Sequence, residues 1–306
     1  MKEIKMEVLS KKNIFITGIT GFTGVHLEKH LLEEGFEVYG TTTNSNSNNP
    51  SHIVCDILKE DDLYNALKII KPDYIIHLAA ISFVASTNKQ NIYNVNIFGT
   101  INLLNAINKL DYIPNKILIA SSAAVYGNVE GELKESMCPQ PVNHYGNSKL
   151  VMENMTKAYF TKQNIIITRP FNYTGIGQKS HFLIPKIISH FIDKKKEIAL
   201  GNMDVYREFN DVDYVIECYK RLLFSNLKSE TINVCSGKTV NIKQIIKIMD
   251  ETVGYNINVN INPEFIRKNE IKMLRGSCKK LETVIGDLAN NYNIENTLKK
   301  IYSEKK

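Results

Sequence analysis

The first half of the chain alternates short runs of aliphatic and β-branched residues with longer segments whose apolar residues recur at the helical period. The runs that predict strands are Asn13–Thr17, Glu37–Gly40, Ile53–Cys55, Tyr74–His77 and Lys116–Ala120. The segments that predict helices are Val25–Leu32, Asp61–Ile70 and Ile92–Ile107. Strands and helices that alternate in this way form a parallel sheet with helices on both faces. We therefore predict the α/β class with a doubly wound parallel sheet.

The alternation becomes less regular after residue 170. A helix is expected over Tyr145–Thr161 and a strand over Ile165–Thr168. Later, Glu230–Val234 and Ile242–Val253 predict one more strand and helix. We predict a larger domain over residues 1–170, to which 230–253 return. Residues 171–229 and 254–306 would then build a smaller α/β lobe.

Three glycines lie in the turn between the first predicted strand and the first predicted helix. Gly18, Gly21 and Gly24 have the spacing G-x-x-G-x-x-G. Glycines in this position allow a tight turn and a close approach of the backbone to a pyrophosphate, and the helix N-terminus attracts its negative charge. The loop predicts a Rossmann-type sheet in which residues 1–170 bind a dinucleotide. The alternative is a glycine turn that binds no ligand.

The end of the second predicted strand bears on the choice of dinucleotide. An Asp or Glu about 20 residues after the glycines would bind the ribose hydroxyls of NAD. The chain has Thr41, Thr42, Thr43 and Asn44 there. Without an acid, a 2′-phosphate is not repelled, so we favour NADP(H) as the cofactor. NAD(H) stays open, because no Arg stands there to bind the phosphate.

Three side chains form a candidate catalytic group. Tyr145 and Lys149 lie four residues apart on a predicted helix and hence on one face. A phenol has a pKa near 10, and a neighbouring cation lowers that pKa toward the working range. Ser122 follows the strand Lys116–Ala120, at the edge of the sheet where ligands bind. The alternatives are a surface Tyr–Lys pair and a serine that caps a turn.

In this order, the motifs resemble the extended short-chain dehydrogenase/reductases that act on nucleotide sugars. The resemblance covers nearly the whole chain through Thr17–Gly24, His77–Ala80, Asn94–Thr100, Ser121–Gly127, Tyr145–Lys149 and Arg169–Asn172. It implies that Ser122, Tyr145 and Lys149 are catalytic. It also implies a cofactor site formed by Gly18, Thr20, Gly21, Phe22, Thr23, Gly24, Thr42, Asp56, Ile57, Leu78, Ala79, Ala80, Asn96, Tyr145 and Lys149.

Two alanines indicate the branch of this family. Sugar 4,6-dehydratases, to which the chain is similar, carry an acid pair directly after the catalytic hydroxyl residue. This chain has Ala123 and Ala124 there, and neither can exchange a proton. Dehydration is therefore disfavoured. The chain instead resembles GDP-4-keto-6-deoxy-D-mannose reductases, through Arg169–Gln178, Gly201-Asn202, Arg207–Val212, Asn233–Lys238, Asn262-Pro263 and Ile266-Arg267.

The same resemblance implies a set of substrate-binding residues: Ser82, Ser121, Asn172, Arg207 and Arg267. Asn172 and the two arginines would contact the pyrophosphate and nucleotide, and guanidinium groups suit phosphate oxygens. The alternative is that the arginines form surface ion pairs. The chain departs from the reductase pattern at Asn210 and after Arg267, which leaves the exact substrate open.

The function that we expect from these residues is NAD(P)H-dependent reduction of the C4 ketone of a nucleotide-linked 4-keto-6-deoxy sugar. Tyr145 would protonate the alkoxide, Lys149 would lower the Tyr145 pKa and hold the nicotinamide ribose, and Ser122 would stabilise the oxyanion. The runner-up is a nucleotide-sugar 4-epimerase or C4 dehydrogenase with tightly bound NAD. A non-catalytic dinucleotide sensor is a third possibility, which the intact catalytic set argues against.

Composition narrows the remaining classes. The chain has 306 residues, a formal net charge of +6 and five cysteines without a C-x-x-C. This favours a reducing compartment and indicates no metal site. Neither a signal peptide nor about 18 consecutive apolar residues for a membrane helix is present, so we expect a cytoplasmic protein. Scattered lysines argue against nucleic-acid binding. The resemblance implies a homodimer formed through helices near Ile92–Ile107 and Tyr145–Thr161.

Overall fold

The computed structural model describes residues 12–45, 47–82, 88–266 and 271–305. The chain divides into two compact units. Residues 1–125, 141–169 and 219–232 form the first unit, and residues 126–140, 170–218 and 233–306 form the second. The segment 230–253, expected to return to the first domain, is divided between the units at residue 232.

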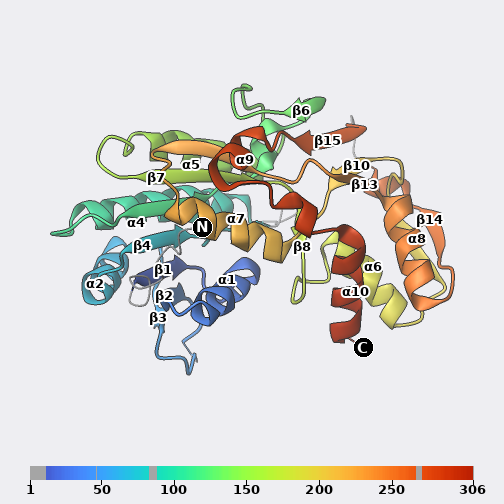
Figure 1. The fold of residues 1–306 in the computed structure, drawn as a ribbon, viewed down its shortest axis with the longest axis horizontal. Coiled ribbons are helices and arrows are strands. Elements are labelled where there is room, and N and C mark those ends of the chain that lie inside the picture. Colours follow the sequence, from blue (N-terminus) through green and yellow to red (C-terminus); the bar gives the residue numbers. More distant parts are fainter. Residues whose placement is uncertain (1–11, 46, 83–87, 267–270, 306) are drawn as a thin grey trace, which may run out of the picture. The chain divides into compact units, whose positions relative to one another are not determined.

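A seven-stranded sheet forms the framework of the first unit (Figure 1). Its strands are β1 (Asn13–Thr17), β2 (Glu37–Thr42), β3 (His52–Val54), β4 (Tyr74–His77), β5 (Lys116–Ala120), β7 (Ile165–Pro170) and β12 (Glu230–Val234). Their order is β12-β7-β5-β4-β1-β2-β3, and the pairs from β3 to β7 are parallel. The strand order reverses between β1 and β4, where such sheets bind ligands. The predicted doubly wound α/β class is confirmed.

Helices cover both faces of this sheet. The helices of the first unit are α1 (Phe22–Glu33), α2 (Glu60–Ile70), α3 (Lys89–Tyr93), α4 (Gly99–Asn108), α5 (His144–Lys157) and the end of α7 (Val212–Phe224). Apolar residues of α2, α4 and α5 form one core cluster with alternate strand residues such as Ile75, Ile117 and Ile165. Strand side chains alternate between faces, so Ile16, Ile76 and Leu118 face the opposite layer.

The helix predicted over Ile92–Ile107 has a different internal structure. It begins at Lys89 and contains a π-helical turn, Asn94–Phe98, between α3 and α4. Such turns are uncommon and often lie at functional sites. Asn96 within this turn is buried, at 1% exposure. Apolar periodicity does not distinguish a π turn from an α turn, so the π turn was not predicted.

Among the described residues, the second unit contains three small sheets, four complete α-helices and the first part of α7. The strands are β6 (Gly131–Leu133), β8 (Tyr173–Thr174), β9 (Glu197–Leu200), β10 (Tyr206–Glu208), β11 (Asn210–Asp211), β13 (Thr239–Asn241), β14 (Asn258–Ile261) and β15 (Met273–Gly276). The helices are α6 (Leu183–Ile192), α8 (Ile242–Val253), α9 (Lys279–Ile285) and α10 (Ile294–Lys305). Apolar faces of α6, α8 and α10 form its core with β9.

Helix α8 shows how local sequence sets an element of this unit. Asn241 and Gln244 form a capping box at its start, and Gly254 ends it in the left-handed conformation, with φ 84°. The predicted range Ile242–Val253 matches this helix. Among the described helices, none has both the length and the apolar character needed to cross a bilayer.

Candidate active site

The glycine loop joins β1 to α1 and is closed by backbone contacts. Gly18 has φ +74°, and its carbonyl accepts the Gly21 N–H at 3.0 Å. A Cβ at Gly24 would overlap the carbonyl oxygens of Gly18 and Ile19. Gly21 precedes α1 without a side-chain cap, and the first turn of α1 carries no acidic residue. The positive end of the helix dipole is therefore not offset by a carboxylate.

The loop lies against the residues that follow β4, at the point where the strand order reverses. A Cβ at Gly18 would be 2.9 Å from the Ala79 Cα, so the two backbones are in close contact. Thr17 fixes this arrangement, because its carbonyl accepts the Leu78 N–H and its hydroxyl accepts the Ala79 N–H. Leu78, Ala79 and Ala80 are half-buried. The structure thus brings the two predicted cofactor segments together.

The other predicted cofactor residues lie at the ends of β2 and β3. The Thr42 hydroxyl is 3.2 Å from that of Thr20 in the glycine loop, and Thr42 accepts the Asn44 N–H. Asp56 accepts the Leu58 N–H and so forms a local turn. Ile57 packs against Gly99, where an added Cβ would be 2.5 Å from Ile57 Cδ1. Phe22 and Thr23 lie in the first turn of α1.

Helix α5 places Tyr145 next to the turn that follows β5. The Asn143 side chain caps the helix by accepting the Gly146 N–H at 2.8 Å. A Cβ at Gly146 would be only 2.6 Å from the Ala124 carbonyl oxygen, so the start of α5 contacts the 3₁₀ turn Ala123–Tyr126. Tyr145 is half-buried beside this contact. A larger residue at position 146 would overlap the Ala124 carbonyl and displace the start of α5.

Lys149 is held by the end of β5. It is 4% exposed, and its ammonium donates to the Ala120 carbonyl at 2.7 Å. Burial lowers the pKa of Lys149 from 10.5 to about 8, and the Glu153 carboxylate opposes this shift. A lysine in this state still carries its charge at neutral pH. It can therefore stabilise a phenolate on Tyr145, one helical turn away.

Ser122 begins the 3₁₀ turn after β5. Its hydroxyl oxygen accepts the Ala124 N–H at 3.1 Å, which is the capping contact that was one alternative for this residue. A hydroxyl group that accepts one hydrogen bond keeps its own proton for another acceptor. The two roles are therefore compatible in one side chain.

Asn96 and Ser121 are buried and have partners within the protein. The Asn96 side chain accepts the Ile81 N–H and donates to the Ile81 carbonyl and to the hydroxyl of Ser148 on α5. It thereby holds the segment that leads to Ser82, which is exposed. Ser121 is 3% exposed and donates to Glu153 at 2.6 Å. Substrate contact by Ser121 and Ser82, and cofactor contact by Asn96, stay predictions.

His77 ends β4 as a buried base, and the sequence analysis included it only as the end of a strand and the first residue of the His77–Ala80 motif. Its Nδ1 is 2.6 Å from the Thr17 hydroxyl and its Nε2 is 2.9 Å from the Thr100 hydroxyl. The Thr100 hydroxyl donates its hydrogen to the Asn96 carbonyl, so it can only accept a hydrogen bond from His77 Nε2–H. His77 Nδ1 then has no hydrogen and accepts a hydrogen bond from the Thr17 hydroxyl. Burial, with a smaller effect of Lys149, lowers the pKa of His77 to about 3. The imidazole is neutral, and these hydrogen bonds fix its tautomer.

The predicted nucleotide-binding residues lie in the second unit. Asn172 is exposed, and its carbonyl accepts the Asn210 N–H at 2.9 Å. Arg207 is half-buried on β10 and donates to the Tyr206 carbonyl. Arg267 lies outside the described residues. Contact of these three residues with a substrate stays a prediction.

Glu208 organises the loops around these residues, and the sequence analysis missed it. Its carboxylate is fully buried and accepts the N–H groups of Gly276 at 2.6 Å, Ser236 at 2.9 Å and Gly237 at 3.3 Å. The Asn210 amide also donates to it. Burial raises the pKa of Glu208, and these donors oppose the shift. Its place between Arg207 and Phe209, within the Arg207–Val212 motif, was the signal that the sequence offered.

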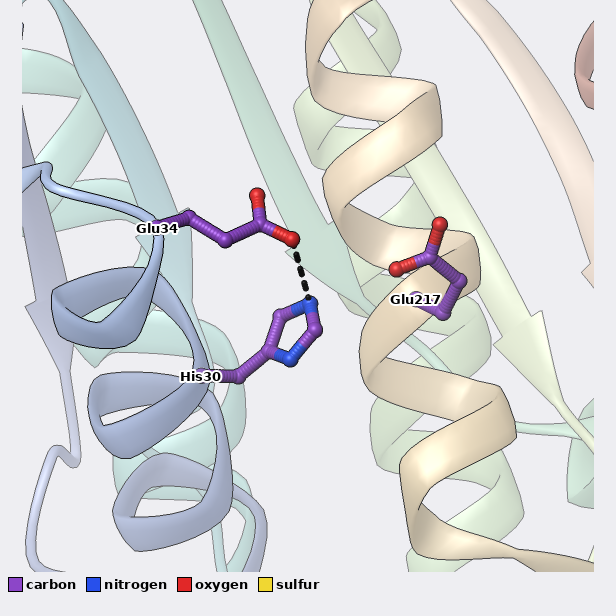
Figure 2. Close-up of side chains that lie close together, drawn as sticks. All are labelled: His30, Glu34 and Glu217. Atoms are coloured by element: carbon purple, nitrogen blue, oxygen red, sulfur yellow. Dashed lines mark ion pairs between the residues drawn. The ribbon is translucent and has the colours of Figure 1, made fainter. Parts of the chain in front are cut away.

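His30 on α1 and Glu34, the residue that follows the helix, do not form a vacant metal site. His30 Nε2 lies 3.3 Å from Glu34 Oε1 (Figure 2). The Lys220 ammonium is 3.3 Å from the same His30 nitrogen and 2.5 Å from Glu34. The lysine already supplies the positive charge at this position. We interpret these residues as an ion-pair cluster that joins α1 to α7.

The family model for GDP-mannose 4,6 dehydratase matches residues 15–301. The chain belongs to this family. It is an extended short-chain dehydrogenase/reductase, a type that comprises NAD(P)-dependent oxidoreductases and epimerases of nucleotide sugars. This identification bears out the resemblance inferred from the motifs.

Two curated members of the family and one solved structure are informative. The chain is 35% identical to a GDP-6-deoxy-D-talose 4-dehydrogenase of Aggregatibacter actinomycetemcomitans, over 95% of this chain and 97% of the relative. It is 29% identical to a GDP-6-deoxy-D-mannose reductase of Pseudomonas aeruginosa, over 90% and 91% of the two chains. The structure of RMD from Pseudomonas aeruginosa, complexed with NADPH, superposes with a TM-score of 0.84 at 28% identity and covers 96% of this chain and 97% of the other.

The residues of the first unit fit the nicotinamide dinucleotide that the family uses. A side chain at Gly24 would overlap backbone carbonyls, and Gly18 lies in close contact with Ala79, so neither position has room for one. The backbone at the start of α1 is therefore uncovered, as the binding of a pyrophosphate requires. Lys149 stands at the end of β5 in the same unit. When bound, such a cofactor supplies or accepts a hydride. The choice between NAD and NADP depends on the end of β2.

Proposed function

We propose that the protein is a reductase of the C4 ketone of a nucleotide-linked 4-keto-6-deoxy sugar, with GDP-4-keto-6-deoxymannose or a close relative as substrate. In this reaction C4 gains a hydride, its oxygen gains a proton, and the ketone becomes a secondary alcohol while NADPH becomes NADP⁺. The observation that carries the proposal is the arrangement of α5 against β5, with Tyr145 beside the Ser122 turn and Lys149 bound to Ala120.

Each of these residues has one role in the proposal. Tyr145 gives its phenolic proton to the developing C4 alkoxide. Lys149 stays cationic at neutral pH and stabilises the resulting phenolate, which a neutral neighbour could not do. Ser122 donates a hydrogen bond from its hydroxyl to the same substrate oxygen and keeps its proton. Lys149 also holds the ribose of the nicotinamide.

Ala123 and Ala124 favour reduction over dehydration. Loss of water across C5 and C6 needs a base at one carbon and an acid at the leaving hydroxyl. The 3₁₀ turn after Ser122 offers two methyl groups instead. Membership of a family described by its dehydratases does not outweigh this, because a family can host several reactions on one fold.

The curated relatives support C4 as the reacting centre. Mannose and talose differ only in configuration at C4, so 6-deoxy-mannose and 6-deoxy-talose give the same 4-ketone on oxidation. One relative is named for a reductase and the other for a 4-dehydrogenase of these GDP sugars. A common GDP-4-keto-6-deoxy sugar links both names. Asn172, Arg207 and Arg267 would bind its diphosphate and nucleotide.

NADP(H) is the cofactor that we propose. The end of β2 has Thr42, Thr43 and Asn44 in place of a carboxylate, so a 2′-phosphate meets hydroxyl and amide groups. The related structure with NADPH supports this choice. We also propose the homodimer. Exposed Phe98, Val151 and Met155 on the helices expected to form it are consistent with a covered surface.

The alternative function is a nucleotide-sugar 4-epimerase or a C4 dehydrogenase with tightly bound NAD. The 4-dehydrogenase relative favours it, as does the resemblance of Ser122–Gly127 to epimerases. An epimerase regenerates its own cofactor, so it would purify with dinucleotide and need no added NADPH. A dehydrogenase would reduce NAD(P)⁺ with a GDP-6-deoxyhexose.

The deciding experiment follows NADPH oxidation by absorbance with freshly generated GDP-4-keto-6-deoxymannose. We expect one NADPH to be consumed for each product molecule formed, and the product to be heavier than the substrate by two hydrogens. Mass spectrometry measures this difference, and NMR determines the configuration at C4. Tyr145→Phe removes the proton donor, so turnover should fall by about 10³-fold while NADPH binding stays within about twofold. Turnover without NADPH use, or an unchanged Tyr145→Phe variant, contradicts the proposal.

A further inference from the structure

A buried carboxylate lies one helical turn beyond Lys149 and joins three elements of the first unit. Glu153 is fully buried on α5. Its Oε1 accepts the Ser121 hydroxyl at 2.6 Å and Arg169 Nε at 2.9 Å, and its Oε2 accepts Arg169 Nη2 at 2.6 Å. Arg169, on β7, is 2% exposed. We call these three residues the Glu153 network.

The network acts on the same short segment as Lys149. The Lys149 ammonium binds the carbonyl of Ala120, and Glu153 binds the hydroxyl of the next residue, Ser121. Successive turns of α5 therefore hold successive residues at the end of β5. Ser122 follows directly. The position of the proposed oxyanion donor thus depends on two contacts from the helix that carries Tyr145.

The charge of Glu153 also affects Lys149. The charged and titratable groups around this lysine are Tyr145 and Glu153 on its own helix, His77 on β4 and Arg169 on β7. His77 is neutral, because its pKa is about 3. Burial works against the ammonium form of Lys149, and Glu153 is the group that favours it. A buried ion pair is seldom retained for stability alone, since an apolar pair of similar volume is often as stable.

We infer that Glu153 is a positioning residue of this enzyme: it fixes the end of β5 through Ser121 and supplies the negative charge that keeps Lys149 cationic, while Arg169 holds its carboxylate in place. The inference rests on the proposed function only where turnover is concerned. The ionisation of Lys149 is a property of the folded protein and is measured without substrate.

The first test removes both charges of the network. Glu153→Gln alone would take from the buried Arg169 guanidinium the carboxylate that neutralises it, so the double variant Glu153→Gln/Arg169→Met is used to preserve folding. Lysine labelled with ¹³C at Cε reports its own ionisation by NMR, and the Lys149 signal is assigned by its loss in Lys149→Met. We expect the Lys149 midpoint to fall in the double variant, by less than about one pH unit, because the loss of the Arg169 cation offsets part of the loss of the Glu153 carboxylate. A midpoint that does not move in a folded double variant overturns the electrostatic role.

Ser121→Ala is the matched control, because it removes one contact of Glu153 and keeps both charges. The Lys149 midpoint should stay at the wild-type value, and an equal shift in this variant would assign the effect to packing and overturn the inference. In the NADPH assay, Ser121→Ala should lower kcat by about tenfold with the KM for NADPH unchanged, since Ser122 is displaced. An unchanged kcat overturns the positioning role.

The turnover measurements add a second readout for charge. In the double variant the alkaline limb of the kcat profile should move to lower pH together with the NMR midpoint, and Glu153→Asp should restore part of it. If the wild-type protein does not oxidise NADPH with any 4-keto sugar, the proposed function fails. The NMR titration then still decides whether Glu153 controls Lys149.

Discussion

Strand β5 has a buried lysine at each end, and the two ends differ in what surrounds the charge. Lys116 begins the strand and is 3% exposed, and Lys149 binds the carbonyl of Ala120, which ends it. Burial lowers both pKa values to about 8. Both ammonium groups donate to backbone carbonyls. By pKa and burial alone, the two lysines are the same.

Their partners separate them. Lys116 donates to the carbonyls of Leu222 and Ser225 at the end of α7, as a lysine that caps a helix C-terminus does. It borders a cavity of 490 Å³ with Asn115 and Asn164, and Lys228 lowers its pKa further. Lys149 has Glu153 and Tyr145 on its helix. A perturbed pKa therefore indicates an active site only together with an acid–base partner at the ligand-binding edge of the sheet.

Removing each lysine in turn gives the largest expected effect. Lys149→Met should lower kcat/KM for NADPH-dependent reduction by about 10³-fold, because Tyr145 loses the charge that stabilises its phenolate. Lys116→Met should stay within about twofold, since only a helix cap is lost. Steady-state NADPH oxidation measures both. Equal losses in the two variants would mean that the distinction between the strand ends is wrong.

The second prediction concerns stability. The folded state lowers the Lys149 pKa from 10.5 to about 8, so below pH 8 the buried charge costs the full amount, about 3 kcal/mol. Lys149→Met avoids this cost and loses one hydrogen bond, worth about 1 kcal/mol. The inactive variant should therefore gain about 2 kcal/mol in unfolding free energy at pH 7. Its advantage should disappear between pH 8 and 10.5.

Urea unfolding of wild type, Lys149→Met and Lys116→Met at pH 7 and pH 10 measures this effect. Lys116→Met should gain less, about 1 kcal/mol, because it avoids a similar cost but loses two hydrogen bonds, to the carbonyls of Leu222 and Ser225. A Lys149→Met variant that is less stable than wild type at pH 7 would contradict this prediction. It would show that interactions in the folded protein offset the desolvation cost of the Lys149 ammonium.

The third prediction uses the neutral base below Lys149. His77 has a pKa of about 3 in the folded state and about 6.5 in the unfolded chain, so the unfolded state alone gains a proton as the pH falls below 6.5. This residue should cost about 2 kcal/mol of stability on going from pH 7 to pH 5. His77→Gln does not titrate, so its stability relative to wild type should rise by that amount over the same interval. A constant difference would contradict a neutral His77.

The fourth and smallest expected effect compares the two ends of α1. Gly24→Ala places a methyl group against the carbonyls of Gly18 and Ile19, so the NADPH Kd should rise by about tenfold. Gly35→Ala, after the other end of the helix, has open space but φ +86°, and should lower stability by about 1 kcal/mol with an unchanged Kd. Fluorescence titration with NADPH and thermal unfolding distinguish the two. A shared effect on Kd would show that the loop responds to helix stability.

The parts of the fold that follow from apolar patterning were predictable. Strands such as Asn13–Thr17 and Lys116–Ala120 match the observed bounds, because period and flanking turns define them locally. The π turn at Asn94–Phe98 was not, since it arises from tertiary contacts of Asn96 with Ile81 and Ser148. The sequence pattern predicted the helix Ile242–Val253, but its place in the second unit depends on tertiary packing.

The candidate site was predictable to the extent that its residues come in short motifs. The glycine loop and the spacing of Tyr145 and Lys149 are visible in the sequence. The partners of these motifs are not, because Glu153 binds Arg169 on β7 and Ser121 directly after β5, and the sequence does not show that these segments meet. The one available signal was the spacing of four residues between Lys149 and Glu153, which places a carboxylate on the same helix face.

The late position of β12 in the chain affects biosynthesis. Strand β7 has a fully buried Ile165–Pro170 sequence and pairs on one side with β5 and on the other with β12. Roughly 60 residues separate the end of β7 from the start of β12, which a ribosome adds in about 3 to 12 s. During that interval an isoleucine-rich edge is open on the nascent protein. Chaperone binding near residue 165 during translation would protect this edge from pairing with another chain.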